Sequence, residues 1–222
     1  MDPIEEWSRA QERVIALLDG ATEEQADRRV PACPDWTVRD LFSHMVGLGS
    51  DVVAGDEPDD HNEAWTQRQV EARRDHTVAQ LIEEWRATAE PLREWMRQHG
   101  PRPLGDVIIH EQDLRGALGV PGGKDSAGVA AIRDRFAPRV GARLPAGTTL
   151  GLVGPGWSWA SDGGEPERAD VVLHADEFEL HRAALARRSA AQIRSWTTKG
   201  DVEPVLDAFA TLGDLPSEDR SE

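Results

Sequence analysis

The stretch LGDVIIHEQDLRGALG, residues 104–119, combines helical spacing with side chains that can bind a metal ion. Asp106 and His110 are four residues apart, so on an α-helix their side chains lie one turn apart on the same face. Asp113 falls on that face too, and apolar residues flank it: Val107, Ile109, Leu114 and Leu118. A buried carboxylate or imidazole is costly unless it is paired or bound to a cation. The inward face of this helix therefore needs a partner.

The opposite side of the same helix is expected to face solvent, because it carries Glu111, Gln112 and Arg115. For the inward face two interpretations stay open. Two metal-competent side chains at positions i and i+4 of a helix are a common way to hold a divalent ion. A plain intrahelical hydrogen bond between aspartate and histidine fits the same spacing, and Asp113 could instead pair with an arginine or cap a turn.

A metal ion would need a third ligand, and His44 is the best candidate. It lies at the edge of an apolar helix face that should meet the other helices in one core. Two histidines and one carboxylate leave coordination positions open, which suits a catalytic Zn²⁺ or another first-row divalent ion. Asp113 would then orient one imidazole. Taken alone, His44 is more typical of a hydrogen-bonded core histidine than of a metal ligand.

Helical patterns fill the first half of the chain. Apolar periodicity predicts four longer helices and one short one, over residues 3–19, 38–55, 78–100, 104–119 and 63–75. Thr37 and Thr77 are the expected N-caps of two of them, and Pro91 should kink or interrupt the helix after Thr77. The segment VPACPDWT, ending at Thr37, is expected to be a proline-rich turn. Short connections between long amphipathic helices favour an up-down bundle over residues 1–118.

The second half of the chain has a different pattern. The segment GVPGGKD, residues 119–125, is typical of a linker between domains. One more helix near residues 126–140, three strand-like runs and two closing helices predict a smaller α+β domain over residues 125–213. The polar tail, residues 214–222, is expected to be disordered. The predicted fold class is thus α plus α+β.

Composition excludes several classes of function. The chain has 222 residues and a formal net charge of −16, which argues against nucleic acid or an anionic membrane as a partner. It has no apolar run long enough to cross a membrane, and its acidic, amphipathic start does not resemble a signal peptide. The single cysteine, Cys33, excludes an intrachain disulfide. A cytoplasmic protein, monomeric or homodimeric, is the expectation.

Two motifs in order resemble a known family. The run VPACPDWTVRDLFSHMVG, residues 30–47, followed by the D-x-x-x-H-E-Q-D-L-R-G-A-L-G motif that begins at Asp106, is similar to the mycothiol-dependent maleylpyruvate isomerase family, a branch of the DinB-like metal enzymes. The resemblance implies a four-helix bundle with metal ligands at His44, Asp106 and His110, with Asp113 behind them. It also implies a C-terminal domain similar to sterol-carrier folds.

The resemblance further implies an activity. A divalent metal, zinc by expectation, would activate mycothiol, a low-molecular-weight thiol, toward an electrophilic small molecule, as an isomerase or an S-transferase. Arg187 is the nearest match to a C-terminal arginine of the family and is a candidate catalytic residue; its alternative is a solvated arginine at a helix end. The isomerases of this family carry glutamate where this chain has Asp106, whose carboxylate reaches less far from the helix.

A rival hypothesis belongs to another class: a non-catalytic metal- or ligand-binding regulatory module on the same bundle. Two further features are interpreted as ordinary. The acidic loop GDEPDDHN, residues 55–62, is expected to be solvated rather than a calcium site. Cys33 has no histidine near it in the sequence and is expected to play no catalytic role.

Overall fold

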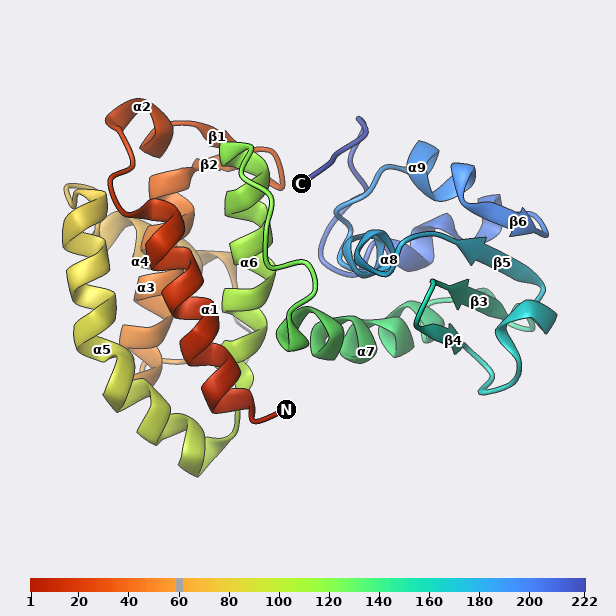
Figure 1. Cartoon of the computed structure of the whole chain (residues 1–222), viewed down its shortest axis with the longest axis horizontal. Helices are drawn as coiled ribbons and strands as arrows, with labels where there is room; N and C mark the ends of the chain where they lie inside the picture. Colours follow the sequence, from red (N-terminus) through yellow and green to blue (C-terminus); the bar gives the residue numbers. More distant parts are fainter. Residues whose placement is uncertain (59–61) are drawn as a thin grey trace. The chain divides into compact units, whose positions relative to one another are not determined.

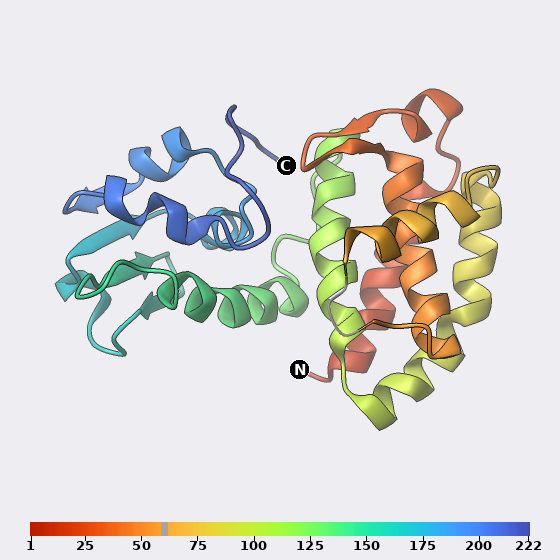
Figure 2. The same ribbon diagram turned by 180° about the vertical axis from the view of Figure 1, so that it is seen from behind.

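The computed structural model describes residues 1–58 and 62–222. The chain divides into two compact units, residues 1–123 and residues 124–221 (Figures 1 and 2). Residues 59–61, which belong to the acidic loop noted above, lie outside the described residues. Each unit is described by itself.

Four long helices build the first unit: α1 (Pro3–Leu18), α3 (Val38–Ala54), α5 (Val78–His99) and α6 (Arg102–Leu118). Each of them packs against two others, α1 against α5 and α6, and α3 against α5 and α6. Their facing sides are apolar and fully buried, with Trp7, Phe42, Leu81 and Ile108 among the core residues. Burial of these side chains is the main force that holds the four helices together.

The helix directions differ from a simple up-down alternation. Figure 1 shows α3 and α5 running the same way, with α1 and α6 running the opposite way. The reason is the connection between α3 and α5, which contains α4 (Glu63–Ala72) and is long enough to return along the bundle. This helix packs on the outside of α3. The expected alternation is therefore wrong for this pair.

Local capping explains where two of these helices begin. The hydroxyls of Thr37 and Thr77 accept the N–H of Asp40 and Gln80, whose side chains in turn bind the N–H of the cap residue. These reciprocal pairs satisfy backbone groups that have no partner inside the helix. Both predicted N-caps are confirmed. Helix α5 continues past Pro91 to His99, so the proline does not end it.

A short hairpin replaces the expected proline-rich turn. Strand β1 (Arg29–Val30) pairs antiparallel with β2 (Cys33–Thr37), after the one-turn helix α2 (Glu23–Ala26). The hairpin lies at the end of the bundle where α3 begins (Figure 1). It carries Cys33 and Trp36 to the start of α3. The sequence shows no strand alternation here because the hairpin is short and interrupted by prolines.

Helix α6 is buried on nearly all sides, which corrects the expectation of a solvent-facing side. Glu111 is fully buried between Arg13 of α1 and Arg115, with nitrogen-to-oxygen distances of 2.9 and 3.0 Å. Gln112 is buried as well and donates to the backbone oxygen of Gly122. The sequence predicts solvated charges here because it does not show the arginine that α1 supplies.

The second unit combines helices with a small sheet. Its elements are α7 (Ala127–Gly141), β3 (Leu150–Val153), β4 (Ser158–Ala160), η1 (Pro166–Arg168), β5 (Val171–His174), α8 (Glu177–Ala184), α9 (Ala190–Ser195), β6 (Thr197–Lys199) and η2 (Glu203–Phe209). The strand order is β4-β3-β5-β6, with β3 and β5 parallel and the outer pairs antiparallel. A helical unit and a mixed unit confirm the α plus α+β class, while likeness to sterol-carrier folds stays a prediction.

The C-terminal tail makes side-chain contacts with the second unit, and the expectation that it is disordered stays a prediction. The carboxylate of Asp219 accepts the hydroxyl of Ser189, and Gln192 donates to the backbone oxygen of Arg220 at 2.7 Å. These bonds attach the tail to the start of α9. Among the described residues, no helix is both long enough and apolar enough to span a bilayer.

Candidate metal centre

Three side chains from two helices converge inside the first unit. His44 comes from α3, and Asp106 and His110 come from α6. Asp106 Oδ1 lies 3.1 Å from His44 Nε2 and 3.4 Å from His110 Nε2. One potential ligand atom from each residue lies within 4.8 Å of the other two. The aspartate is thus bracketed by two imidazoles, and its short side chain reaches both.

The helices explain this convergence. Asp106 and His110 lie one turn apart on the face of α6 that packs against α3. The buried face of α3 includes His44, whose ring crosses that of His110 at 82° with centroids 5.3 Å apart. All three side chains are largely buried, with exposed fractions of 6% for His44, 16% for Asp106 and 14% for His110. The two α6 side chains are therefore slightly more exposed than His44.

Asp113 determines how the ring of His110 is oriented. Its Oδ2 lies 3.0 Å from His110 Nδ1, and its side chain is fully buried. An ionised carboxylate can only accept, so Nδ1 is the donor, and in the neutral imidazole the lone pair is then on Nε2. That lone pair is directed to the side where Asp106 lies. Asp113 thus contacts His110 on the ring atom that faces away from Asp106, and its role behind a metal ligand stays a prediction.

A different partner orients His44. Its Nδ1 lies 2.7 Å from Oε1 of Gln69, which is buried on α4. The amide nitrogen of Gln69 donates to Asp51 Oδ2 at 2.8 Å. Because that carboxylate accepts only, the amide oxygen must face His44, and Nδ1 must be the donor. His44 Nε2 is then left for Asp106, as in His110.

These surroundings shift the protonation of His44. Burial alone would lower its pKa, but the carboxylate of Asp106, with the hydrogen bond to Gln69 and the charge of Asp51, raises the pKa of His44 above its ordinary value. Without a metal ion, a proton on His44 Nε2 can form a hydrogen bond to the carboxylate of Asp106. A divalent cation in that position would bind the same carboxylate and would also accept the lone pair of His110 Nε2.

The donor set fits a zinc ion. Ligand atoms about 2.0–2.1 Å from zinc at tetrahedral angles lie about 3.3 Å apart, and the two nitrogen-to-oxygen distances here are 3.1 and 3.4 Å. Two imidazoles and one carboxylate are a common protein contribution to a catalytic zinc site, which keeps a fourth position open. Each histidine has its Nδ1 atom bound to Gln69 or Asp113, so Nε2 is the nitrogen that would face the zinc ion in both rings.

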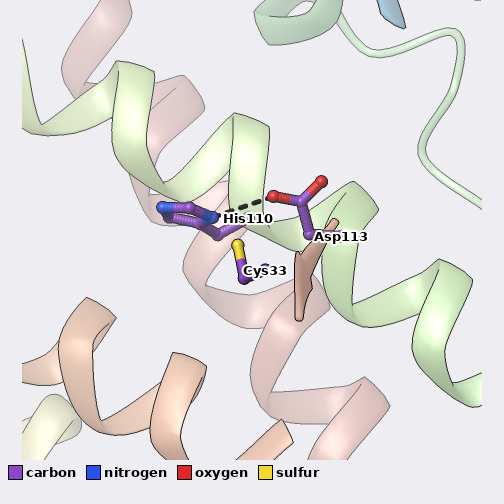
Figure 3. Close-up of side chains that lie close together, drawn as sticks. All are labelled: Cys33, His110 and Asp113. Carbon is purple, nitrogen blue, oxygen red and sulfur yellow. Dashed lines mark hydrogen bonds and ion pairs between the residues drawn. The ribbon is translucent and has the colours of Figure 1, made fainter. Parts of the chain in front are cut away.

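A second group of metal-competent side chains overlaps the first. Cys33, His110 and Asp113 also offer one ligand atom each within 4.8 Å. Figure 3 shows the sulfur of Cys33 beside the ring of His110, with Asp113 joined to the same ring by its hydrogen bond. Local sequence patterns do not reveal this group, because the hairpin brings Cys33 to a helix that begins about 70 residues later.

A cavity of about 300 Å³ lies next to the cluster, between β2 and α4. Trp36 is one of its walls, and the Trp36 ring lies 5.2 Å from the ring of His44. The other lining residues are Cys33, Pro34, Asp35, Glu63 and Gln67. The volume is at the lower end of the range for small-molecule sites. None of the three cluster residues is among its lining residues, so Trp36 and Cys33 are the side chains that join the cavity to the cluster.

Arg187 lies in the second unit, apart in sequence from these residues. It follows Ala186, whose φ of 58° is left-handed, and its guanidinium donates to the backbone oxygen of Leu185 at 3.0 Å. It is buried. A catalytic role for Arg187 stays a prediction.

Comparison with family models gives one match. Residues 7–111 match the mycothiol maleylpyruvate isomerase N-terminal domain. The helical unit belongs to this family. The match includes His44, Asp106 and His110 and ends at residue 111, inside α6, and the second unit lies outside it. Comparison with curated proteins and with solved structures gave no match.

Sequence reasoning missed Gln69 and Asp51. A helical face on α4 was visible, but nothing in the sequence said that α4 packs on α3 at the level of His44. One signal was available: Gly47, one turn after His44, marks a place where another helix can approach closely.

Proposed function

We propose that the first unit holds a divalent metal ion, zinc by preference, through His44, Asp106 and His110, and that the protein uses it to activate a low-molecular-weight thiol. The name of the matched domain suggests mycothiol as that thiol. The thiol would add to an electrophilic small molecule or be transferred to it, so that the protein acts as an isomerase or an S-transferase.

The bracketing of Asp106 by two imidazole Nε2 atoms is the observation that supports this proposal most strongly. Both rings have their Nδ1 atoms occupied by acceptors, Gln69 and Asp113, so each ring turns its Nε2 atom toward Asp106, and a metal ion there would replace the proton on His44 Nε2. A metal ion bound there would lower the pKa of a coordinated thiol, so that the nucleophilic thiolate forms near neutral pH.

The chain's own residues have separate tasks in this scheme. His44, Asp106 and His110 would supply three ligands and so leave a fourth coordination position for the sulfur. The cavity beside Trp36 would bind the organic part of the thiol or of the electrophile. Asp35 and Glu63 line it and give it a negative potential, which favours hydroxyl-rich or cationic groups over carboxylates.

Thiol consumption measures the proposed activity directly. Purified protein with mycothiol and a panel of electrophiles should consume thiol faster than buffer. A chelator should abolish this activity, and zinc should restore it. The matched variants are His110→Ala, which should be inactive and metal-free, and Cys33→Ser, which should stay active. Activity that survives complete metal removal and is lost in Cys33→Ser would overturn the proposal.

A second candidate function rests on the overlapping group. A metal ion held by Cys33, His110 and Asp113 would have a fully buried carboxylate among its ligands, and such closed sites are typical of structural or regulatory metals. The protein would then be a non-catalytic binding module. Loss of bound metal in Cys33→Ser, with metal retained in Asp106→Ala, would favour this alternative.

A further inference from the structure

The two histidines of the cluster are oriented by chemically different partners. The carboxylate of Asp113 accepts a hydrogen bond from Nδ1 of His110, whereas the neutral amide of Gln69 accepts one from Nδ1 of His44. A carboxylate behind an imidazole raises its strength as a ligand and fixes its tautomer. An amide can fix the tautomer only if it cannot rotate, because its two ends are a donor and an acceptor of similar size.

We propose that Gln69, whose amide is held in one orientation by Asp51, is the positioning residue that decides which nitrogen of His44 faces the metal centre. This inference rests on the proposed metal site. The amide nitrogen of Gln69 lies 2.8 Å from Asp51 Oδ2, and its oxygen lies 2.7 Å from His44 Nδ1. A rotated amide would present N–H to His44 and oxygen to a carboxylate, which costs both hydrogen bonds.

The backbone around Gln69 is built for this contact. A Cβ placed on Gly47 would lie only 2.5 Å from Cβ of Gln69, so α4 can approach α3 at this level because residue 47 is glycine. Gly47 has no positive φ to explain it. Its role is therefore close approach of the two helices, one turn from His44.

Arg73 holds the backbone of Gln69. Its guanidinium forms a two-pronged ion pair with Glu84 of α5 and also donates to the backbone oxygen of Gln69 at 3.2 Å. This guanidinium is mostly buried, with a side-chain exposed fraction of 10%. Three helices thus hold Gln69: α3 through Gly47 and Asp51, α4 through its own backbone, and α5 through Glu84.

The chain offers a sharp exchange experiment. Gln69→Leu keeps the size of the side chain but removes the acceptor. The double change Asp51→Asn and Gln69→Glu inverts the pair and leaves the net charge unchanged. The carboxylate introduced at position 69 accepts from His44, and the amide introduced at position 51 donates to that carboxylate. Gln11→Leu is the matched control, because Gln11 is also a buried glutamine of this unit, with its amide donating to Trp85 O at 2.9 Å.

Zinc affinity, measured by competition with a chromophoric chelator, is the first readout. We expect Gln69→Leu to weaken zinc binding by roughly 10- to 100-fold, the range for loss of a partner behind a ligand. The inverted pair should bind at least as tightly as wild type, because it puts a carboxylate behind His44. Gln11→Leu should bind as wild type. Unchanged affinity in Gln69→Leu, or an inverted pair as weak as Gln69→Leu, would overturn the inference.

Nitrogen-15 NMR of the histidine rings is the second readout. The Nδ1 proton of His44 should exchange slowly in wild type and in the inverted pair, and rapidly in Gln69→Leu. This proton is expected with or without zinc, so the measurement separates two failures. A wild-type protein that binds no zinc contradicts the proposed function. The exchange rate of the His44 Nδ1 proton in wild type and in Gln69→Leu then tests the role of Gln69 by itself. A slowly exchanging Nδ1 proton in Gln69→Leu contradicts the inference whatever zinc does.

Discussion

Asp113 accepts a hydrogen bond from His110 and is not a member of the group formed by His44, Asp106 and His110. In Asp113→Asn the amide can present N–H to Nδ1 and stabilise the tautomer whose Nε2 carries the proton. We therefore expect roughly 10- to 100-fold weaker zinc binding with little change in fold. Chelator competition measures the affinity, and Asp75→Asn, at an exposed aspartate, is the control. Wild-type affinity in Asp113→Asn would show that the ring is held by packing alone.

Proton release follows from the raised pKa of His44. Metal binding requires a deprotonated Nε2, so the proton that Asp106 stabilises must leave. Zinc affinity should rise with pH through the pKa of His44 and level off above it. The stability of the metal-free protein should change with pH in the opposite direction. The raised pKa of His44 contributes to the free energy of unfolding below about pH 6.5, and this contribution is lost as the pH rises through the folded-state pKa. Calorimetry in two buffers of different ionisation enthalpy counts the released proton.

At the scale of elements, α1 and α6 are joined by a buried ion-pair network around Glu111. Glu111→Ala would leave Arg13 and Arg115 without their shared carboxylate. Removing one partner of a buried pair costs about 3 kcal/mol or more, so we expect a clear loss in the free energy of unfolding. Zinc affinity of the folded protein should not change, because Glu111 points away from the cluster. Denaturant titration measures the loss, with the exposed ion-pair residue Glu5 changed to alanine as control.

The limits of sequence reasoning also lie at this scale. Thr37 and Thr77 were predictable as caps because the signal is confined to four residues. The face shared by Asp106 and His110 was predictable for the same reason. The hydrogen bond from His44 to Gln69, the position of Cys33 and the burial of Glu111 depend on which element packs on which. Such contacts join residues 25 to 98 positions apart, and periodicity carries no information about them.

At the scale of the whole molecule, the cluster is complete within the first unit. His44, Asp106, His110 and their partners all lie between residues 1 and 123. A chain ending at residue 123 should therefore bind zinc as the full protein does, provided that it folds by circular dichroism. Loss of zinc in a folded truncated chain would show that the second unit supplies a ligand.

The predicted role of Arg187 concerns the substrate and not the metal. Arg187→Ala in the full protein should therefore keep zinc and lower thiol transfer.

The molecule carries a large negative charge. A formal net charge of −16 repels nucleic acids and anionic lipids. Among the described residues, both groups of potential metal ligands lie in the helical unit, and that unit carries the family match.

X-ray absorption at the zinc edge of the zinc-loaded protein tests the central claim most directly, because it distinguishes the two overlapping groups by element. Coordination by His44, Asp106 and His110 predicts only nitrogen and oxygen neighbours at about 2.0–2.2 Å, with scattering from two imidazole rings. His110→Ala should lose this signal together with the metal. A sulfur neighbour at about 2.3 Å in the absence of added thiol would place Cys33 on the metal and contradict the account.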